Sequence, residues 1–145
     1  MSSKIHFFNE DVDFRFKHKS IITKWITSIV KSEGQSIADI NYIFCSDDYL
    51  LEMNKEYLQH DYYTDIITFD NRESLDESLS SDIFISIDRI KDNAQTLGIS
   101  FETELYRVLI HGVLHLLGQS DKTKAQKAQM RKREEASLSL LQIPK

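Results

Sequence analysis

Two histidines and an aspartate near the end of the chain have the spacing of a metal site. His111 and His115 are four residues apart, in a segment whose apolar residues recur with helical spacing. On a helix their imidazoles project from one face, so both can reach one ion. Gly118 then ends the helix, and the chain can turn back to bring Asp121 to the same ion. Three protein ligands leave a fourth position for water, as a catalytic zinc ion requires.

The pattern HxxxHxxGxxD also separates this site from that of a zinc peptidase. It has the spacing of the peptidase motif HExxHxxGxxH, with Asp121 in place of the third histidine. Gly112 stands where a peptidase carries the glutamate that acts as general base, so the sequence favours a metal site without proteolysis. The alternative is that both histidines are ordinary hydrogen-bonded core residues. Packing alone does not account for a glycine and an aspartate at these offsets.

A basic stretch follows the candidate metal site directly. Its six positive charges have no acidic residue between the first and the last; they are Lys122, Lys124, Lys127, Arg131, Lys132 and Arg133. One interpretation is a phosphate-contacting surface formed by Lys122, Lys124, Lys127 and Arg131. The other is a solvated helix face. The net charge of −5 argues against a protein that coats nucleic acid without specificity.

The elements that must position these residues follow from periodicity and capping signals. Ser100 is a candidate N-cap, and the apolar spacing predicts a helix over 101–117. Its apolar arc is very wide, which predicts a buried central element. Further helices are expected over 17–33, 47–58, 88–97 and 123–141, and strands over 5–8, 40–45, 65–69 and 82–87, with a loop over 70–81. No regular βαβ repeat is visible. We therefore expect an α+β fold: a small mixed sheet with a buried, zincin-like central helix.

Composition limits the remaining possibilities. The 145 residues fit a single domain over 1–145, and 41% hydrophobic with 28% charged residues is ordinary for a globular protein. Cys45 is the only cysteine and lies in an apolar strand, so we expect a buried, unreactive thiol and a reducing compartment. The first apolar run is too short for a signal peptide, and no run of 18 apolar residues could span a membrane. A cytoplasmic location is expected.

Three segments resemble the bacterial YbeY endoribonuclease family. HGVLHLLGQSD (residues 111–121) resembles that family's HGxLHLxGxDH signature, and NKEYLQHDYYTDIITF (54–69) is similar to its NxxYRxKDxPTDVLSF segment. SDIFIS (81–86) looks like its GDIxIS strand. The segments occur in the family's order, and the resemblance covers residues 45–141.

The resemblance implies a function and a ligand set. It implies a zinc-dependent, single-strand-specific endoribonuclease that acts at the 3′ end of small-subunit ribosomal RNA and in ribosome quality control. The family's metal ligands fall on His111, His115 and Asp121, with one zinc per chain. Single-stranded ribosomal RNA and the ribosome are the implied partners. Neither a membrane nor a small-molecule cofactor is expected.

The chain departs from the family pattern at several positions. Asp121 stands where most members have a third histidine, Leu58 where an arginine is usual, and His60 where a lysine is usual. The missing arginine keeps a second hypothesis open, an RNA- or ribosome-associated binding module with little or no catalysis. His60 and Asp65 are the positional candidates for acid–base catalysis, although Asp65 could instead pin the turn into a strand. The tyrosines of this segment could stack on unpaired bases or pack across the sheet; they are Tyr57, Tyr62 and Tyr63.

Overall fold

The structure, a computed structural model, describes residues 4–143, which form four strands and five helices. The predicted domain also includes 1–3 and 144–145, which lie outside the described residues. In chain order the elements are β1 (Ile5–Asn9), α1 (Lys19–Ser32), β2 (Ile37–Cys45), α2 (Asp47–Leu58), β3 (Ile66–Asp70), β4 (Leu79–Ser86), α3 (Ile87–Leu97), α4 (Phe101–Leu116) and α5 (Lys124–Ser139). The predicted α+β fold with a small mixed sheet is confirmed.

The sheet has the strand order β1-β2-β4-β3. β2 lies parallel to both β1 and β4, with Tyr42 opposite Ile83, while β3 runs antiparallel to β4 at the edge. Because parallel neighbours need a crossover, β1 and β2 are joined through α1. The parallel strands β2 and β4 are joined by a second crossover, which runs through α2 and β3. The expectation of no regular βαβ repeat therefore has to be set beside two crossovers, of which only the first is a simple βαβ unit.

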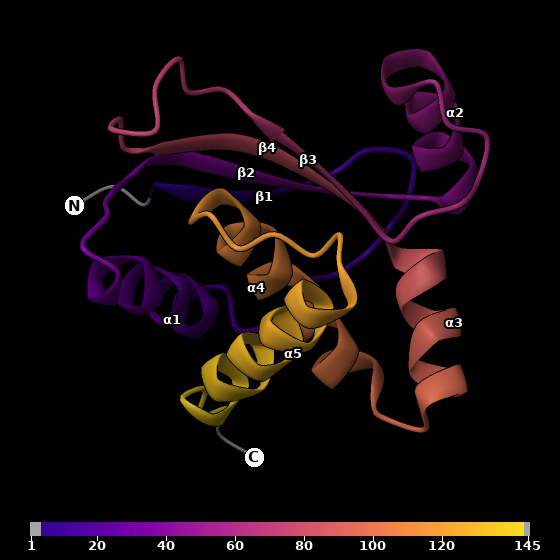
Figure 1. Ribbon diagram of the computed structural model, residues 1–145. Coiled ribbons are helices and arrows are strands. Elements are labelled where there is room, and N and C mark those ends of the chain that lie inside the picture. Colours follow the sequence, from indigo (N-terminus) through magenta and orange to yellow (C-terminus); the bar gives the residue numbers. More distant parts are fainter. Residues whose placement is uncertain (1–3, 144–145) are drawn as a thin grey trace.

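Helix α4 is the buried centre of the molecule, as predicted. One side faces the sheet, where the Tyr42 hydroxyl donates to the Leu109 carbonyl oxygen at 2.9 Å. Figure 1 shows α1, α4 and α5 below the sheet. Helices α2 and α3 lie at one end of the sheet, with α2 above and α3 below. Ile22, Ile83 and Leu109 are fully buried in the core that these elements share. The helix with the two histidines is therefore held on several sides.

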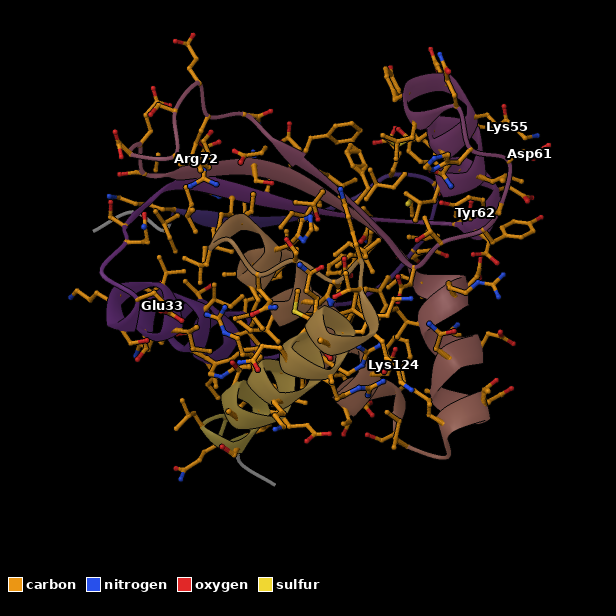
Figure 2. The ribbon with its side chains drawn as sticks, viewed as in Figure 1. Glu33, Lys55, Asp61, Tyr62, Arg72 and Lys124 are labelled. Carbon is orange, nitrogen blue, oxygen red and sulfur yellow. The ribbon has the colours of Figure 1, made fainter. Side chains whose placement is uncertain are left out.

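Both ends of α4 are fixed by specific hydrogen bonds. At its start the Ser100 hydroxyl accepts from the Thr103 amide at 3.1 Å, the cap that the sequence predicted. At its other end Arg72 donates to the Leu116 carbonyl oxygen at 2.8 Å and pairs with Asp70. The Arg72 side chain is only 3% exposed, and Figure 2 shows it in the β3–β4 connection. This connection thus anchors the turn that follows α4.

The β3–β4 connection is shorter than predicted. The sequence predicted a loop over 70–81 because the segment is polar, but β3 extends to Asp70 and β4 begins at Leu79. The Asp70–Ser81 pair closes the antiparallel ladder, and Asn71 donates to the Ser80 carbonyl oxygen at 2.8 Å. Ladder hydrogen bonds outweigh the low strand propensity of these polar residues.

The other face of the sheet is covered in part by α2. A small apolar cluster joins Cys45, Leu50 and Ile67 there. Burial raises the pKa of the Cys45 thiol to about 12, and nearby carboxylates such as Asp11 and Asp88 add to this effect. The prediction that this cysteine is buried is confirmed, and its low reactivity stays a prediction. Among residues 4–143, no helix has both the length and the apolar character needed to cross a membrane.

Candidate metal centre

The turn after α4 brings Asp121 back to the helix, as we predicted from Gly118. Gly118 has a φ of +106°, a conformation that side chains disfavour, and Gln119 donates to the Leu114 carbonyl oxygen at 3.0 Å. As a result the Oδ2 atom of Asp121 lies 3.4 Å from the Nε2 atom of His111. Two of the three predicted ligands are therefore in contact.

His115 lies one turn further along α4, on the exposed side. Its Nδ1 atom lies 3.1 Å from the Gln119 carbonyl oxygen, within the same turn. In the part of the chain that the structure describes, no three His, Cys, Asp or Glu side chains are gathered as a ready metal cluster. The complete ligand set therefore stays a prediction.

The hydrogen bonds of both rings fit a metal ion on the Nε2 side. The Nδ1 atom of His111 lies 2.6 Å from Oε2 of Glu134, and that of His115 faces the Gln119 carbonyl oxygen. A ring that donates from Nδ1 keeps the lone pair of Nε2 free, which is how metal-bound histidines are commonly oriented. Two imidazole nitrogens and one carboxylate oxygen also form a donor set that suits zinc.

A buried ionic network supports His111 from behind. Arg107 donates to Oε1 of Glu104 at 2.8 Å and to Oε1 of Glu134 at 3.0 Å. The side chains of Glu104 and Glu134 are 0% and 3% exposed, so their charges need this compensation. Burial alone would raise the pKa of Glu134, but His111 and Arg107 outweigh it and lower the pKa. Glu134 is thus held as a carboxylate.

The surroundings of His111 favour positive charge. Burial acts to lower the pKa of its imidazole, but the Glu134 hydrogen bond and the carboxylates of Asp65 and Asp121 outweigh it, so the pKa is raised. The acidic groups converge on one ring from different elements: the start of β3, the turn after α4, and α5. A divalent cation would supply the positive charge that these groups favour.

Of the two predicted catalytic residues, the structure places only Asp65 beside the histidine helix. Asp65 precedes β3, where its carbonyl oxygen accepts from the Ser86 amide at 3.0 Å and its carboxylate accepts from Asn93 at 3.4 Å. It therefore does pin the turn into the strand. Burial raises the pKa of its carboxyl, an effect that the positive charges of Arg107 and His111 oppose. The hydrogen bonds of Asp65 thus fit the turn role, and its role in acid–base catalysis stays a prediction.

His60 lies in the connection between α2 and β3. Its ring stacks on Tyr62 with centroids 5.1 Å apart, and its Nδ1 atom lies 2.9 Å from the Tyr62 hydroxyl. Figure 2 shows Tyr62 near α2, at the end of the molecule where the sheet meets α3. A catalytic role for His60 therefore stays a prediction that these contacts do not support.

Gly112 packs directly against the sheet. A Cβ atom at this position would lie 3.1 Å from Cδ1 of Ile66 and 3.3 Å from Cδ1 of Ile83, tighter than ordinary contacts. The residue next to the first histidine thus faces two isoleucines and, at 3.4 Å, the hydroxyl oxygen of Thr68. The structure leaves little room for the glutamate of a zinc peptidase.

Comparison with known proteins identifies the family. Residues 4–142 match the family model described as Endoribonuclease YbeY. The chain belongs to the YbeY endoribonuclease family. It is 54% identical to the Endoribonuclease YbeY of Cytophaga hutchinsonii over 94% of each chain. It is 45% identical to that of Porphyromonas gingivalis, over 97% of this chain and 91% of the relative.

The fold agrees with this family membership. A solution structure of a Thermotoga maritima protein superposes with a TM-score of 0.63 at 26% identity, covering 93% of this chain and 89% of the other. The resemblance stated from three short segments is thus confirmed over residues 4–142, including the region before residue 45.

The basic residues predicted to contact RNA lie around the start of α5. Lys122 precedes the helix, and Lys124, Lys127 and Arg131 follow at helical spacing along one exposed face. Figure 2 shows Lys124 at the beginning of α5. Within residues 4–143 none of these four side chains forms an ion pair. Arg133, by contrast, forms an ion pair with Glu33 and donates a hydrogen bond to Oε1 of Gln119 at 3.2 Å. Contact with RNA stays a prediction, and Arg133 has a structural role.

The three tyrosines are largely exposed. Tyr57, Tyr62 and Tyr63 are 60%, 55% and 49% exposed. Tyr57 also packs on the sheet, where its ring and that of Phe69 in β3 form a T-shaped pair with centroids 6.0 Å apart. The guanidinium of Arg89 lies 5.2 Å from the centre of the Tyr63 ring. Their rings remain accessible from solvent.

The buried network behind His111 was not predicted from the sequence. A signal existed for two of its members, because Arg107 and Glu104 lie four and seven residues before His111 and therefore share its face of α4. Glu134 had no such signal, because it follows 23 residues later in another helix. Only the packing of α5 on α4 brings it to the ring.

Proposed function

We propose that this chain is a zinc-dependent endoribonuclease that cleaves single-stranded RNA, with one zinc ion held by His111, His115 and Asp121. The observation that carries the proposal is the orientation of the two imidazoles, whose Nδ1 atoms are engaged while Nε2 of His111 faces Asp121. Membership of the YbeY endoribonuclease family supports RNA as the substrate. We further propose ribosomal RNA as the target, at the 3′ end of the small-subunit RNA, with a role in ribosome quality control in the cytoplasm.

The residues of the chain divide the work of cleavage among them. Bound zinc would polarise a phosphoryl oxygen and lower the pKa of a coordinated water. Asp65 is our candidate for proton transfer, because burial raises its pKa and it lies within the electrostatic influence of His111. Lys124, Lys127 and Arg131 attract the phosphates, and Tyr62 and Tyr63 offer exposed rings on which unpaired bases can stack.

One observation favours the alternative of a binding module with little catalysis. Leu58, at the end of α2, stands where the family usually has an arginine, and its side chain is 43% exposed. An exposed leucine cannot clamp a phosphate as an arginine does. The alternative predicts RNA binding without turnover.

RNA cleavage with defined variants separates these two functions. Wild-type protein should cut a labelled single-stranded RNA, lose this activity with a chelator and regain it when zinc is added. His111→Ala and His115→Ala should be inactive, while His6→Ala, an exposed histidine on β1, serves as the matched control. Tight RNA binding without zinc-restorable cleavage by the wild type would instead establish the binding module.

A further inference from the structure

The two carboxylate oxygens of Glu134 have different partners. Oε1 accepts from Nη1 of Arg107 at 3.0 Å, and Oε2 lies 2.6 Å from Nδ1 of His111. Arg107 also donates two hydrogen bonds to Glu104, at 2.8 Å and 2.5 Å. This buried cluster of Glu104, Arg107, Glu134 and His111 joins α4 to α5.

We propose that Glu134 is a positioning residue that selects the ring tautomer of His111. An ionised carboxylate only accepts and a guanidinium only donates, so Arg107 occupies Oε1 and the ring must donate from Nδ1 to Oε2. In the neutral ring the Nε2 lone pair then faces Asp121, whose Oδ2 atom lies 3.4 Å away. The inference rests on the proposed function only where it concerns metal affinity; the tautomer follows from the hydrogen bonds alone.

The location of Glu134 in α5 is itself fixed by packing. Met130 and Ser137 lie about one turn before and after it, both buried, and the Trp25 indole nitrogen donates to the Ser137 carbonyl oxygen at 2.8 Å. The Thr123 capping box starts this helix two residues after Asp121. One segment therefore supplies both the third predicted ligand and the carboxylate that orients the first.

Glutamine at position 134 should reverse the tautomer. The amide keeps the size of the side chain but has a single acceptor oxygen, and Arg107 can bond only to that oxygen. The amide nitrogen then faces His111 and donates, so Nδ1 must accept and the ring proton moves to Nε2. The atom needed by the metal becomes blocked. Glu104→Gln is the matched control, because Glu104 is equally buried and bonds Arg107 but has no hydrogen bond to the ring.

Two measurements on the full chain test the proposal. Nitrogen-15 NMR of the metal-free protein, at a pH where the ring is neutral, should show His111 protonated on Nδ1 in the wild type and Glu104→Gln, and on Nε2 in Glu134→Gln. Competition with a chromogenic chelator should show zinc affinity lowered by about 10–100-fold in Glu134→Gln and changed by less than about threefold in Glu104→Gln. Thermal melts check that both variants are folded.

The outcomes distinguish this inference from the proposed function. An Nδ1-protonated ring in folded Glu134→Gln overturns the tautomer assignment, and unchanged zinc affinity despite a changed tautomer overturns its link to the metal. If the wild type binds no zinc, the proposed function fails, and the NMR measurement still decides the role of Glu134.

Discussion

At the scale of single residues, Gly112 combines a chemical and a steric consequence. It removes the general base of a zinc peptidase, and it lets α4 approach Ile66 and Ile83 closely. A family assignment from the histidine spacing alone would have missed the second effect. The same position therefore underlies the prediction of no peptidase activity and allows the tight packing of α4 against the sheet.

Gly112→Glu should destabilise the protein without creating a peptidase. The carboxylate would be forced into a tightly packed interface formed by Ile66, Ile83 and the Thr68 hydroxyl, at a cost of about 3 kcal/mol or more. Urea unfolding measures the loss, with Ala128→Glu on the exposed face of α5 as the control. Chelator-sensitive casein cleavage by the wild type that disappears in His115→Ala would contradict the account.

Cys45 should resist alkylation in the folded protein. Its pKa is raised to about 12, so the reactive thiolate is scarce at neutral pH, and the side chain is fully buried. In the unfolded chain the thiol ionises near its ordinary pKa of about 8.5. Ionisation therefore favours unfolding, and this contribution lowers stability as the pH rises above about 8.5. Iodoacetamide labelling with and without urea tests this, and fast labelling of the native protein would contradict it.

At the scale of elements, local sequence signals predicted most of the fold. The apolar periodicity located α1 and α4, Ser100 and Gly118 marked where α4 begins and turns back, and β-branched runs located the strands. Strand pairing and the α1 crossover could not be read from one sequence, because they depend on contacts between distant segments. For the same reason the sequence indicated Asp121 but not Glu134, which reaches His111 only through α5 packing.

Arg72→Met should loosen the end of α4. It removes the donor to the Leu116 carbonyl oxygen and the partner of Asp70, and an unsatisfied buried carbonyl costs about 1–3 kcal/mol. Hydrogen exchange should speed up in residues 117–121, with Arg15→Met, an exposed arginine, as the control. Unchanged exchange in residues 117–121 would show that the hydrogen bond from Arg72 to Leu116 does not hold the turn.

The ion pair between Arg72 and Asp70 should make the stability of the protein depend on pH in the acidic range. The hydrogen bonds from Arg72 lower the pKa of Asp70 despite some opposing burial, so the stabilisation is present above the unfolded pKa. It is lost as the pH falls through the folded pKa. Denaturant unfolding across the acidic range should show a shallower decline for Arg72→Met than for the wild type. Equal slopes would contradict the coupling.

At the scale of the whole molecule, the charges are unevenly placed. The net charge is −5, yet four unpaired basic side chains of the described chain cluster around the start of α5, beside the turn that carries Asp121. Such a local patch can attract a polyanion to one face despite the overall negative charge. We therefore predict that this face, rather than the overall composition, attracts RNA.

Neutralising this face should weaken RNA binding and its salt dependence. In the triple variant Lys124→Gln, Lys127→Gln, Arg131→Gln, each lost phosphate contact should lower the log–log salt slope by roughly 0.7. The matched control replaces Lys19, Lys24 and Lys31 of α1, which are equally exposed. Filter binding at several salt concentrations measures both quantities. Identical affinity and salt slope in the two triple variants would show that the basic face of α5 is only a solvated surface.

Anomalous diffraction at the zinc edge, from crystals of the zinc-loaded protein, tests the metal site most directly. The account predicts one peak per chain, at roughly 2.0–2.2 Å from Nε2 of His111, Nε2 of His115 and a carboxylate oxygen of Asp121. His111 would keep its Nδ1 bond to Glu134, and the peak would be absent in His111→Ala. A zinc-loaded crystal with no peak between these three side chains, or with zinc bound elsewhere on the chain, would contradict the account.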